Sequence, residues 1–411
     1  MCFIGLDCHK KSIEVVEVLS ASSKIKRHFK LATDIETLKG FAATLNCDDV
    51  VALESTTNAF EIAKILRTGV AKVVISNPMK AKIIWESKVK TDKVDAEALA
   101  RMLASDFLPV IWEPDDHLQH LRKLTSHAQA LGKQKTMAKN RIHSILHRNL
   151  IKYGDDFDNL FSIKGRAFLT TLSLPEDERF QLNQNLALLD YMDATISITH
   201  QHLAQRSYPD DDILRLMTLQ GIDHYSAAGL KAAIGDILRF PNPKKLVSYL
   251  GLNPSVHQSG SSCYFGPITK RGRSQARWLL IQAAQSAVKS PGPLRAFYLR
   301  LSRRKPRNKV IVAVAAKMVH IIWHMLTKKE DYFYSAPLRT KEKIAKLRIR
   351  ATGARLKSGS QKGVPSKGGR KTYLQARRSD LDKARSAEQQ YNEFIKSRFN
   401  IDSSTYYTNK D

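Results

Sequence analysis

Cysteine is scarce in this chain, and no secretion signal is visible at its start. The 411 residues include four cysteines, none of them in a CxxC pair: Cys2, Cys8, Cys47 and Cys263. This spacing supports neither a zinc ribbon nor a disulfide framework, and it fits a reducing compartment. The first apolar stretch reaches an acid at Asp7, too early for the apolar core of a signal peptide. We therefore expect a cytoplasmic protein.

Long uninterrupted apolar runs are also lacking. The most apolar stretch, 310–325, is interrupted by Lys317, His320 and His324. A buried helix is therefore favoured over a membrane span.

Acidic residues are few relative to basic ones. Lys and Arg number 67 against 39 Asp and Glu, which gives a formal net charge of +28. Such an excess suits a polyanionic partner, because each cation that neutralises a phosphate releases a counterion. A membrane surface is the other option for a basic protein, but the charge is spread along the chain instead of forming one amphipathic helix. We expect nucleic acid as the partner, and no membrane.

The first 112 residues have the pattern of an α/β domain. Short apolar runs predict strands, and longer periodic stretches predict helices. The expected strands are 2–6, 12–19, 24–31, 49–53 and 72–76. The expected helices are 34–45, with Asp34 as its N-cap, 58–67 and one that ends near Leu103. The order strand, hairpin, helix, strand, helix, strand, helix is typical of a ribonuclease-H-like domain.

The rest of the chain is predicted to be mostly helical. Over 113–208, leucine and isoleucine recur at helical spacing, and no proline occurs between Pro114 and Pro175. This pattern predicts a helical, coiled-coil arm with a break at 154–158. Over 209–335 we expect a compact helical domain, and 336–411 is predicted to be a basic tail that is disordered over 339–371, with a short helix near 381–394.

Within 209–335, the segment 216–234 resembles a helix-hairpin-helix element, in which a Gly turn offers backbone N–H groups to phosphate. A helix to Leu250, a polar loop to Gly272 and a basic helix with Arg273 and Arg277 are expected to follow.

Four carboxylates near the start of the chain are predicted to meet. Asp7 and Glu54 each end a buried strand, and Asp92 and Asp95 lie three apart at the start of a helix, on one face. Two carboxylates about 4 Å apart repel by roughly 4 kcal/mol at an effective dielectric near 20. A cluster of four is therefore expected to bind divalent cations, and the pattern indicates two-metal phosphoryl chemistry.

Each acid taken alone has a simpler interpretation. Asp7 could close a turn, Glu54 could cap the next helix, and Asp92 could be a helix N-cap. His9 and Lys10, just after Asp7, could contact phosphate or be ordinary surface residues.

A second candidate site is the serine-rich segment 258–262, about ten residues before the basic run 270–273. Such a segment is usually a flexible loop. A serine hydroxyl becomes a useful nucleophile only with a base, a metal or cationic surroundings, and Lys270, Arg271, Arg273 and Arg277 provide the last of these in sequence. Together with Lys10, these four residues are expected to bind nucleic acid.

In their order, the motifs of this chain resemble those of the insertion-sequence one-ten family, also called DEDD transposases. The matching pieces are 5–10 (GLDCHK), 52–56 (ALEST), 90–96 (KTDKVDA), 99–100 (LA), 221–222 (GI), 234–240 (IGDILRF), 249–254 (YLGLNP), 259–260 (SG) and 268–272 (ITKRG). Thr57 and Asp223 stand where that family commonly has glycine, and the basic tail has no counterpart.

The resemblance implies a RuvC-like N-terminal domain that binds Mg²⁺, as one or two ions, through Asp7, Glu54, Asp92 and Asp95. It also implies a C-terminal transposase domain whose nucleophile is Ser259, with Ser261 and Ser262 as neighbours that could take the role. The family's serine attacks DNA to give a covalent phosphoserine. An RNA from the element guides the choice of donor and target DNA.

The family's catalytic site joins two subunits, so the resemblance implies a dimer or tetramer of a prokaryotic, nucleoid-associated protein. Two rival interpretations remain at this point. One is a metal-dependent, resolvase-like nuclease that uses water alone. The other is a nucleic-acid-binding protein without catalysis.

Overall fold

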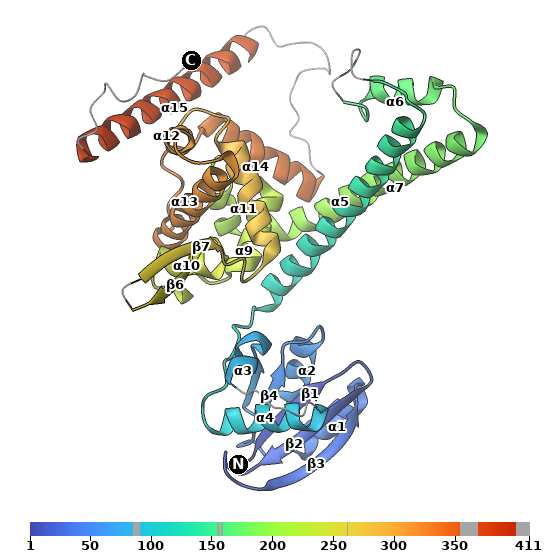
Figure 1. Ribbon diagram of the computed structural model, residues 1–411, viewed down its shortest axis with the longest axis vertical. Helices are drawn as coiled ribbons and strands as arrows, with labels where there is room; N and C mark the ends of the chain where they lie inside the picture. The colour runs from blue at the N-terminus through green and yellow to red at the C-terminus, as the bar shows by residue number, and fades with distance from the viewer. Residues whose placement is uncertain (85–90, 154–156, 158, 261, 354–368, 400–411) are drawn as a thin grey trace. The chain divides into compact units, whose positions relative to one another are not determined.

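A five-stranded sheet forms the centre of the N-terminal unit, in the strand order β3-β2-β1-β4-β5 (Figure 1). The strands are β1 (Phe3–Cys8), β2 (Ser12–Val18), β3 (Ile25–Ala32), β4 (Val50–Glu54) and β5 (Lys72–Ser76). β2 pairs antiparallel with β1 and β3, whereas β4 pairs parallel with β1 and β5. Parallel strands have crossover helices, so both faces of this sheet are covered.

In this computed structural model the residues described are 1–84, 91–153, 157, 159–260, 262–353 and 369–399. They fall into two compact units, Met1–Pro114 and Asp115–Asp411. The finer division of the chain at residues 112, 208 and 335 stays a prediction.

Helices cover the two faces of the sheet with different partners. α1 (Ile35–Thr44) and α2 (Ala59–Leu66) pack on the face that carries Ile4, Leu6 and Leu53. α4 (Asp92–Ala104) packs on the opposite face, over Ala52 and Val16, and α3 (Pro78–Ile84) follows β5. Asp34 caps α1, as expected, by accepting a hydrogen bond from the Thr37 N–H. The predicted order of strands and helices is confirmed as far as β5, after which the described residues form two helices, α3 and α4, where one helix was expected.

Gly5 lies beneath α4, in the middle of the central strand. A Cβ atom there would lie 2.0 Å from the Ala96 carbonyl oxygen and 2.7 Å from the Ala100 backbone nitrogen. Only glycine therefore lets the backbone of α4 approach β1 this closely. This contact sets the distance between the first turn of α4 and the end of β1.

Two long helices begin the C-terminal unit, α5 (Asp116–Arg148) and α7 (Glu176–Ser207), which pack side by side (Figure 1). α6 (Ile163–Thr171) closes one end with a small apolar core that includes Ile142, Leu169 and Leu182. Long helices are thus confirmed, while most of the predicted break at 154–158 lies outside the described residues.

The remaining elements form a helical assembly with one hairpin. They are α8 (Asp211–Leu216), α9 (His224–Ile234), η1 (Ile237–Arg239), α10 (Pro243–Tyr249), β6 (Pro254–Ser259), β7 (Ser262–Ile268), α11 (Ser274–Ala287), α12 (Pro293–Ser302), α13 (Arg307–Lys328), α14 (Pro337–Thr352) and α15 (Gly369–Phe399). α13 is the one described helix that is long and apolar enough to cross a membrane. It packs against α10, α11 and α12, as expected for a core helix.

Two predictions in this part of the chain were wrong. The polar loop expected before Gly272 contains the β6–β7 hairpin, whose strands are exposed on both faces and so lack the alternating apolar pattern of a half-buried strand. The disorder expected from 339 onward does not apply to α14, which packs on α7 with Leu347 as its buried residue. Residues 354–368 of that stretch lie outside the described residues, and α15 is longer than the helix expected near 381–394.

Gly5→Ala is expected to lower the free energy of unfolding by about 1–3 kcal/mol, because the backbone of α4 must move away from the new methyl group. Gly40→Ala is the matched control. Nothing lies within 4 Å of a Cβ at Gly40, and alanine in an exposed helix interior stabilises by about 0.5–1 kcal/mol. Calorimetric unfolding of the full chain measures both variants. A neutral or stabilising Gly5→Ala would contradict the close packing.

Candidate functional site

Three polar residues lie at the carboxyl ends of adjacent strands, on the face of the sheet that α4 covers. Gly5 faces α4, so Asp7, two residues later, faces the same side. Leu6 pairs with Leu53 in register, which places Glu54 of β4 beside Asp7. Glu54 in turn pairs with Ser76 of β5. The strand ends therefore present two carboxylates and a hydroxyl along one edge of the sheet.

The other two acids begin α4. Asp92 is its first residue and Asp95 lies one turn later, while the N-cap is Thr91, whose side chain accepts a hydrogen bond from the Val94 N–H. Asp92 is thus not the cap. Glu54 does not cap α2 either, because Asn58 occupies that position, and Asp7 lies inside β1 and not in a turn. The three simpler interpretations of these acids are therefore excluded.

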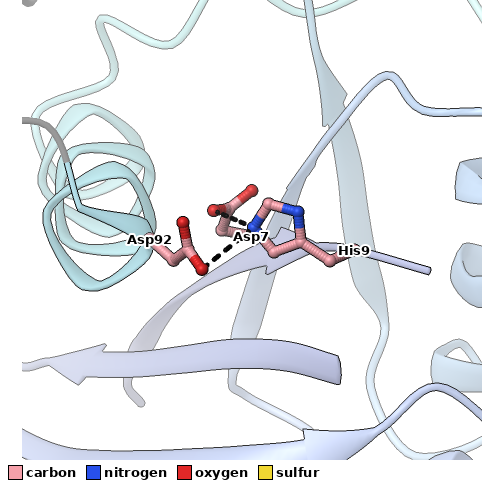
Figure 2. Close-up of side chains that lie close together, drawn as sticks. All are labelled: Asp7, His9 and Asp92. Carbon is pink, nitrogen blue, oxygen red and sulfur yellow. Dashed lines mark hydrogen bonds and ion pairs between the residues drawn. The ribbon is translucent and has the colours of Figure 1, made fainter. Parts of the chain in front are cut away.

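His9 brings two of the acids together, as Figure 2 shows. Its Nε2 atom lies 3.0 Å from Asp7 Oδ2 and 3.3 Å from Asp92 Oδ2. One ligand atom from each of these three residues lies within 4.8 Å of the other two. The sequence left His9 undecided between phosphate contact and ordinary surface, and the structure places it between the carboxylates.

Burial and neighbouring charge both act on Asp7, whose side chain is 8% exposed. Burial raises the pKa of the Asp7 carboxyl, His9 offsets part of this effect, and the charges of Asp92 and Asp95 raise the pKa further. The Asp7 carboxylate, in turn, is the main cause that raises the pKa of His9. Burial, then the charges of Asp7 and Glu54, raise the pKa of the Cys8 thiol to about 12. All four acids therefore contribute to one negative field at the end of β1.

The donor set fits a hard divalent cation. Mg²⁺ takes oxygen ligands and is usually bound through one or two carboxylates, and Asp7 and Asp92 both lie within hydrogen-bond distance of the His9 ring. The Ser76 hydroxyl, in the same row of strand ends, is buried without a hydrogen-bond partner among the described residues. Glu54 and Asp95 lie outside the 4.8 Å cluster, so the structure assembles part of the predicted tetrad directly and leaves two acids beside it.

Glu14 is a further buried acid that sequence reasoning missed. It is the partner of Asp7 across β1 and β2. Burial alone raises the pKa of Glu14, but hydrogen bonds from Lys30 at 2.8 Å and His28 at 2.9 Å lower it overall. Lys30 and His28 of β3 stabilise the Glu14 carboxylate, so it does not require a metal ion. The alternation of acids and bases in β2 and β3 was the signal that could have identified this pair.

The predicted serine lies at the tip of an exposed hairpin. Ser259 ends β6 and pairs with Ser262, the first residue of β7, across a turn that begins at Gly260. Ser261 lies outside the described residues. Among those described, no side chain makes a hydrogen bond to the Ser259 hydroxyl. This hairpin alone does not supply a base that would activate the serine.

The basic residues predicted to bind nucleic acid form two groups. Lys10, in the turn after β1, and Lys270 and Arg271, before α11, are exposed. Burial lowers the pKa of Arg273, and Arg277 donates hydrogen bonds at 3.2 Å to the Leu250 and Arg271 carbonyl oxygens. The first group is therefore available to a ligand, whereas Arg277 holds the base of the hairpin in place.

Two family models match the chain, and together they cover more than half of it. Residues 4–150, which include all four acids, match a transposase model for the DEDD domain of the IS110 group. Residues 214–299, which include the hairpin, match the model of the transposase IS116/IS110/IS902 family.

Individual transposases show similarity over longer stretches. The transposase of insertion sequence IS1111A from Coxiella burnetii is 28% identical over 59% of this chain and 68% of its own length. A probable family 20 transposase from Pseudomonas aeruginosa is 26% identical over 59% of this chain and 74% of its own. The transposase of IS1328 from Yersinia enterocolitica is 23% identical, over 79% of this chain and 96% of its own.

Mg²⁺ is expected to raise the melting temperature of the chain. At a free concentration about 100 times Kd, a ligand that binds only the folded state stabilises it by about 2.7 kcal/mol. Asp7→Asn should abolish most of this effect, because it removes a charge at the centre of the cluster. Glu36→Gln, at an exposed acid in the first turn of α1, should keep it. Equal Mg²⁺ shifts in all three proteins would contradict a metal site at Asp7.

Proposed function

Because the chain belongs to the IS116/IS110/IS902 family of transposases and so cuts and joins DNA, we propose that it moves an insertion sequence with two sets of residues. One is the acidic site of Asp7, Glu54, Asp92 and Asp95, and the other is Ser259. The observation that carries this proposal is the meeting of Asp7 and Asp92 around His9 at the end of the central strand.

The N-terminal unit is proposed to be a RuvC-like, ribonuclease-H-like domain. The strand order β3-β2-β1-β4-β5, antiparallel at β2, supports this assignment. So does the position of Asp7 on the central strand, with Glu54 on the strand beside it.

The four acids are proposed to bind Mg²⁺, as one or two ions. Bound there, the metal would supply charge that polarises a scissile phosphate. The protein's own contribution is rigidity, because Asp7 and Glu54 belong to hydrogen-bonded strands and Asp92 and Asp95 occupy the first helical turn of α4.

Ser259 is proposed as the nucleophile. Its oxygen would form an ester bond to a DNA phosphorus, the bond from that phosphorus to the neighbouring deoxyribose oxygen would break, and the leaving oxygen would take up a proton. A hydroxyl from a second DNA end would then reverse the step and release the serine. The exposure of Ser259 at a hairpin tip gives DNA access to it.

The activating partner of Ser259 is proposed to come from the acidic site of another subunit, so that the working enzyme is a dimer or tetramer. The lack of a hydrogen-bonding side chain around Ser259 in the described part of the chain supports this arrangement. A structured guide RNA is the further proposed partner, since a net charge of +28 suits more than one nucleic acid. Lys10, Lys270 and Arg271 are proposed to contact these phosphates.

Ser259→Ala is expected to abolish covalent protein–DNA adducts, and Asp7→Ala to abolish strand transfer, each by roughly 10³-fold or more. Ser262→Ala, on the facing strand of the same hairpin tip, is the control and should retain activity. Adducts are measured on denaturing gels, and recombination is measured between donor and target plasmids.

A Ser259→Ala protein that still cleaves DNA, with the acids required and without an adduct, would favour a nuclease that uses water. Full recombination by both variants would exclude the proposed mechanism.

A mixture of Asp7→Ala and Ser259→Ala proteins is expected to recover recombination, because one subunit would supply the serine and the other the acids. The control mixes Asp7→Ala with the Asp7→Ala/Ser259→Ala double variant and should stay inactive. If the first mixture is as inactive as the control, the two halves of the site must come from the same subunit.

A further inference from the structure

A cavity of about 630 Å³ lies in the C-terminal unit, between the turn around Gly221, one side of α11 and one side of α14. Its volume is within the range of roughly 300–1,000 Å³ that is usual for small-ligand sites. The family match ends at residue 299. α14, which forms one wall of the cavity, therefore lies outside the matched segment. Figure 1 labels the two helices, α11 and α14.

Trp278 provides an aromatic surface at this cavity. It lies on α11 with 44% of its surface exposed, while Leu279 and Leu280 beside it are buried in the core. In the described part of the chain, no ring stacks on the indole and no cation lies over it. Gln282 follows one turn later on the same face and also lines the cavity. An indole with an available face beside an amide suits a nucleic-acid base, because every base can stack and carries polar edges.

α14 provides positive charge on the opposite side. Arg339, Lys343 and Lys346 line the cavity at the spacing of one helix face. Lys343 is committed to the fold, since its ammonium group donates hydrogen bonds to the carbonyl oxygens of Met217, Leu219 and Ile222 at 2.8, 3.3 and 2.8 Å. Arg339 and Lys346 are exposed and make no ion pair with the described residues, so their charges remain available to an anion.

The acids of the cavity already have partners. The Asp223 carboxylate caps α9 by accepting a hydrogen bond from the Ser226 N–H at 2.8 Å. Glu342 accepts a hydrogen bond from the Tyr373 hydroxyl at 2.9 Å. The lining holds three cations and these two acids, so its formal charge is 3 − 2 = +1. A phosphate would therefore be held by the cations of α14 and not by the hairpin-like turn, where Asp223 lies.

We propose that this cavity binds one unpaired nucleotide of a single strand, with its base on Trp278 and its phosphate between Arg339 and Lys346. A duplex is too wide to enter a concave site of this volume, whereas a base that has left its stack can do so. The proposal rests on the proposed function insofar as the chain must bind nucleic acid. It adds a single-strand site distinct from the acids and from Ser259.

The test measures the affinity of the full chain by fluorescence anisotropy. The three labelled probes are an oligo-dT strand, an oligo-U strand and a duplex, each of about 16 nucleotides. Trp278→Ala is expected to weaken single-strand binding roughly tenfold and to leave duplex binding within about twofold. Trp278→Phe, which keeps an aromatic face, should retain most of the affinity. Phe333→Ala, at an aromatic that is 88% exposed elsewhere, is the matched control and should change nothing.

A second variant makes the test independent of the indole. Arg339→Ala/Lys346→Ala is expected to weaken single-strand binding and to make its salt dependence shallower, because two phosphate contacts are lost. A loss confined to oligo-U identifies an RNA nucleotide, a loss confined to oligo-dT identifies DNA, and a loss on both identifies a site for either.

Unchanged single-strand affinity in Trp278→Ala, or an equal loss on the duplex, would overturn the cavity proposal while leaving the proposed function intact. A wild-type chain that binds none of the three probes would overturn both.

Discussion

The close packing of α4 on β1 is the contact on which the acidic site depends. Gly5 lets the backbone of the helix pass at a distance that any side chain would prevent. The strand carries Asp7 and the helix carries Asp92 and Asp95, so this spacing decides how strongly the three carboxylates repel one another. Hydrogen bonding between β1 and β4 then places Glu54 at the same edge. Burial is the largest cause of the raised pKa of Asp7, and the charges of Asp92 and Asp95, which this backbone contact brings close, raise it further.

Two neighbouring buried acids of the sheet are stabilised in different ways. Glu14 pairs with Lys30 and His28, and its charge is matched within the fold. Asp7 has His9 as its hydrogen-bond partner, but the charges of Asp92 and Asp95 add to its own. This imbalance costs stability in the protein alone, and a divalent cation would remove the cost. Glu14 therefore has a structural role in the sheet, whereas Asp7, Asp92 and Asp95 are the acids of the proposed site.

Sequence patterns predicted the elements whose side chains face a core. The strands that end at Asp7 and Glu54, the cap at Asp34 and the start of α4 follow from apolar periodicity and capping, and the structure has them all. The β6–β7 hairpin was missed because neither of its faces is buried, so the only local signal was the turn at Ser259 and Gly260. α14 was missed because one buried leucine, Leu347, is too little for a periodic pattern. The place of His9 between two acids depends on a contact between distant segments, which spacing alone does not reveal.

The exposed β6–β7 hairpin is held in place at its base and not at its tip. A two-stranded ribbon is marginally stable by itself, and this one is held at its base, where Arg277 donates to two carbonyl oxygens and Thr269 bonds to Asn253. His257 and Tyr264 stack across the strands at 4.7 Å, further toward the tip. Beyond them, no side chain of the described residues makes a hydrogen bond to the Ser259 hydroxyl. In the proposed mechanism the position of that oxygen would therefore be fixed by the surface of the other subunit, and a single subunit would hold the serine without a defined orientation.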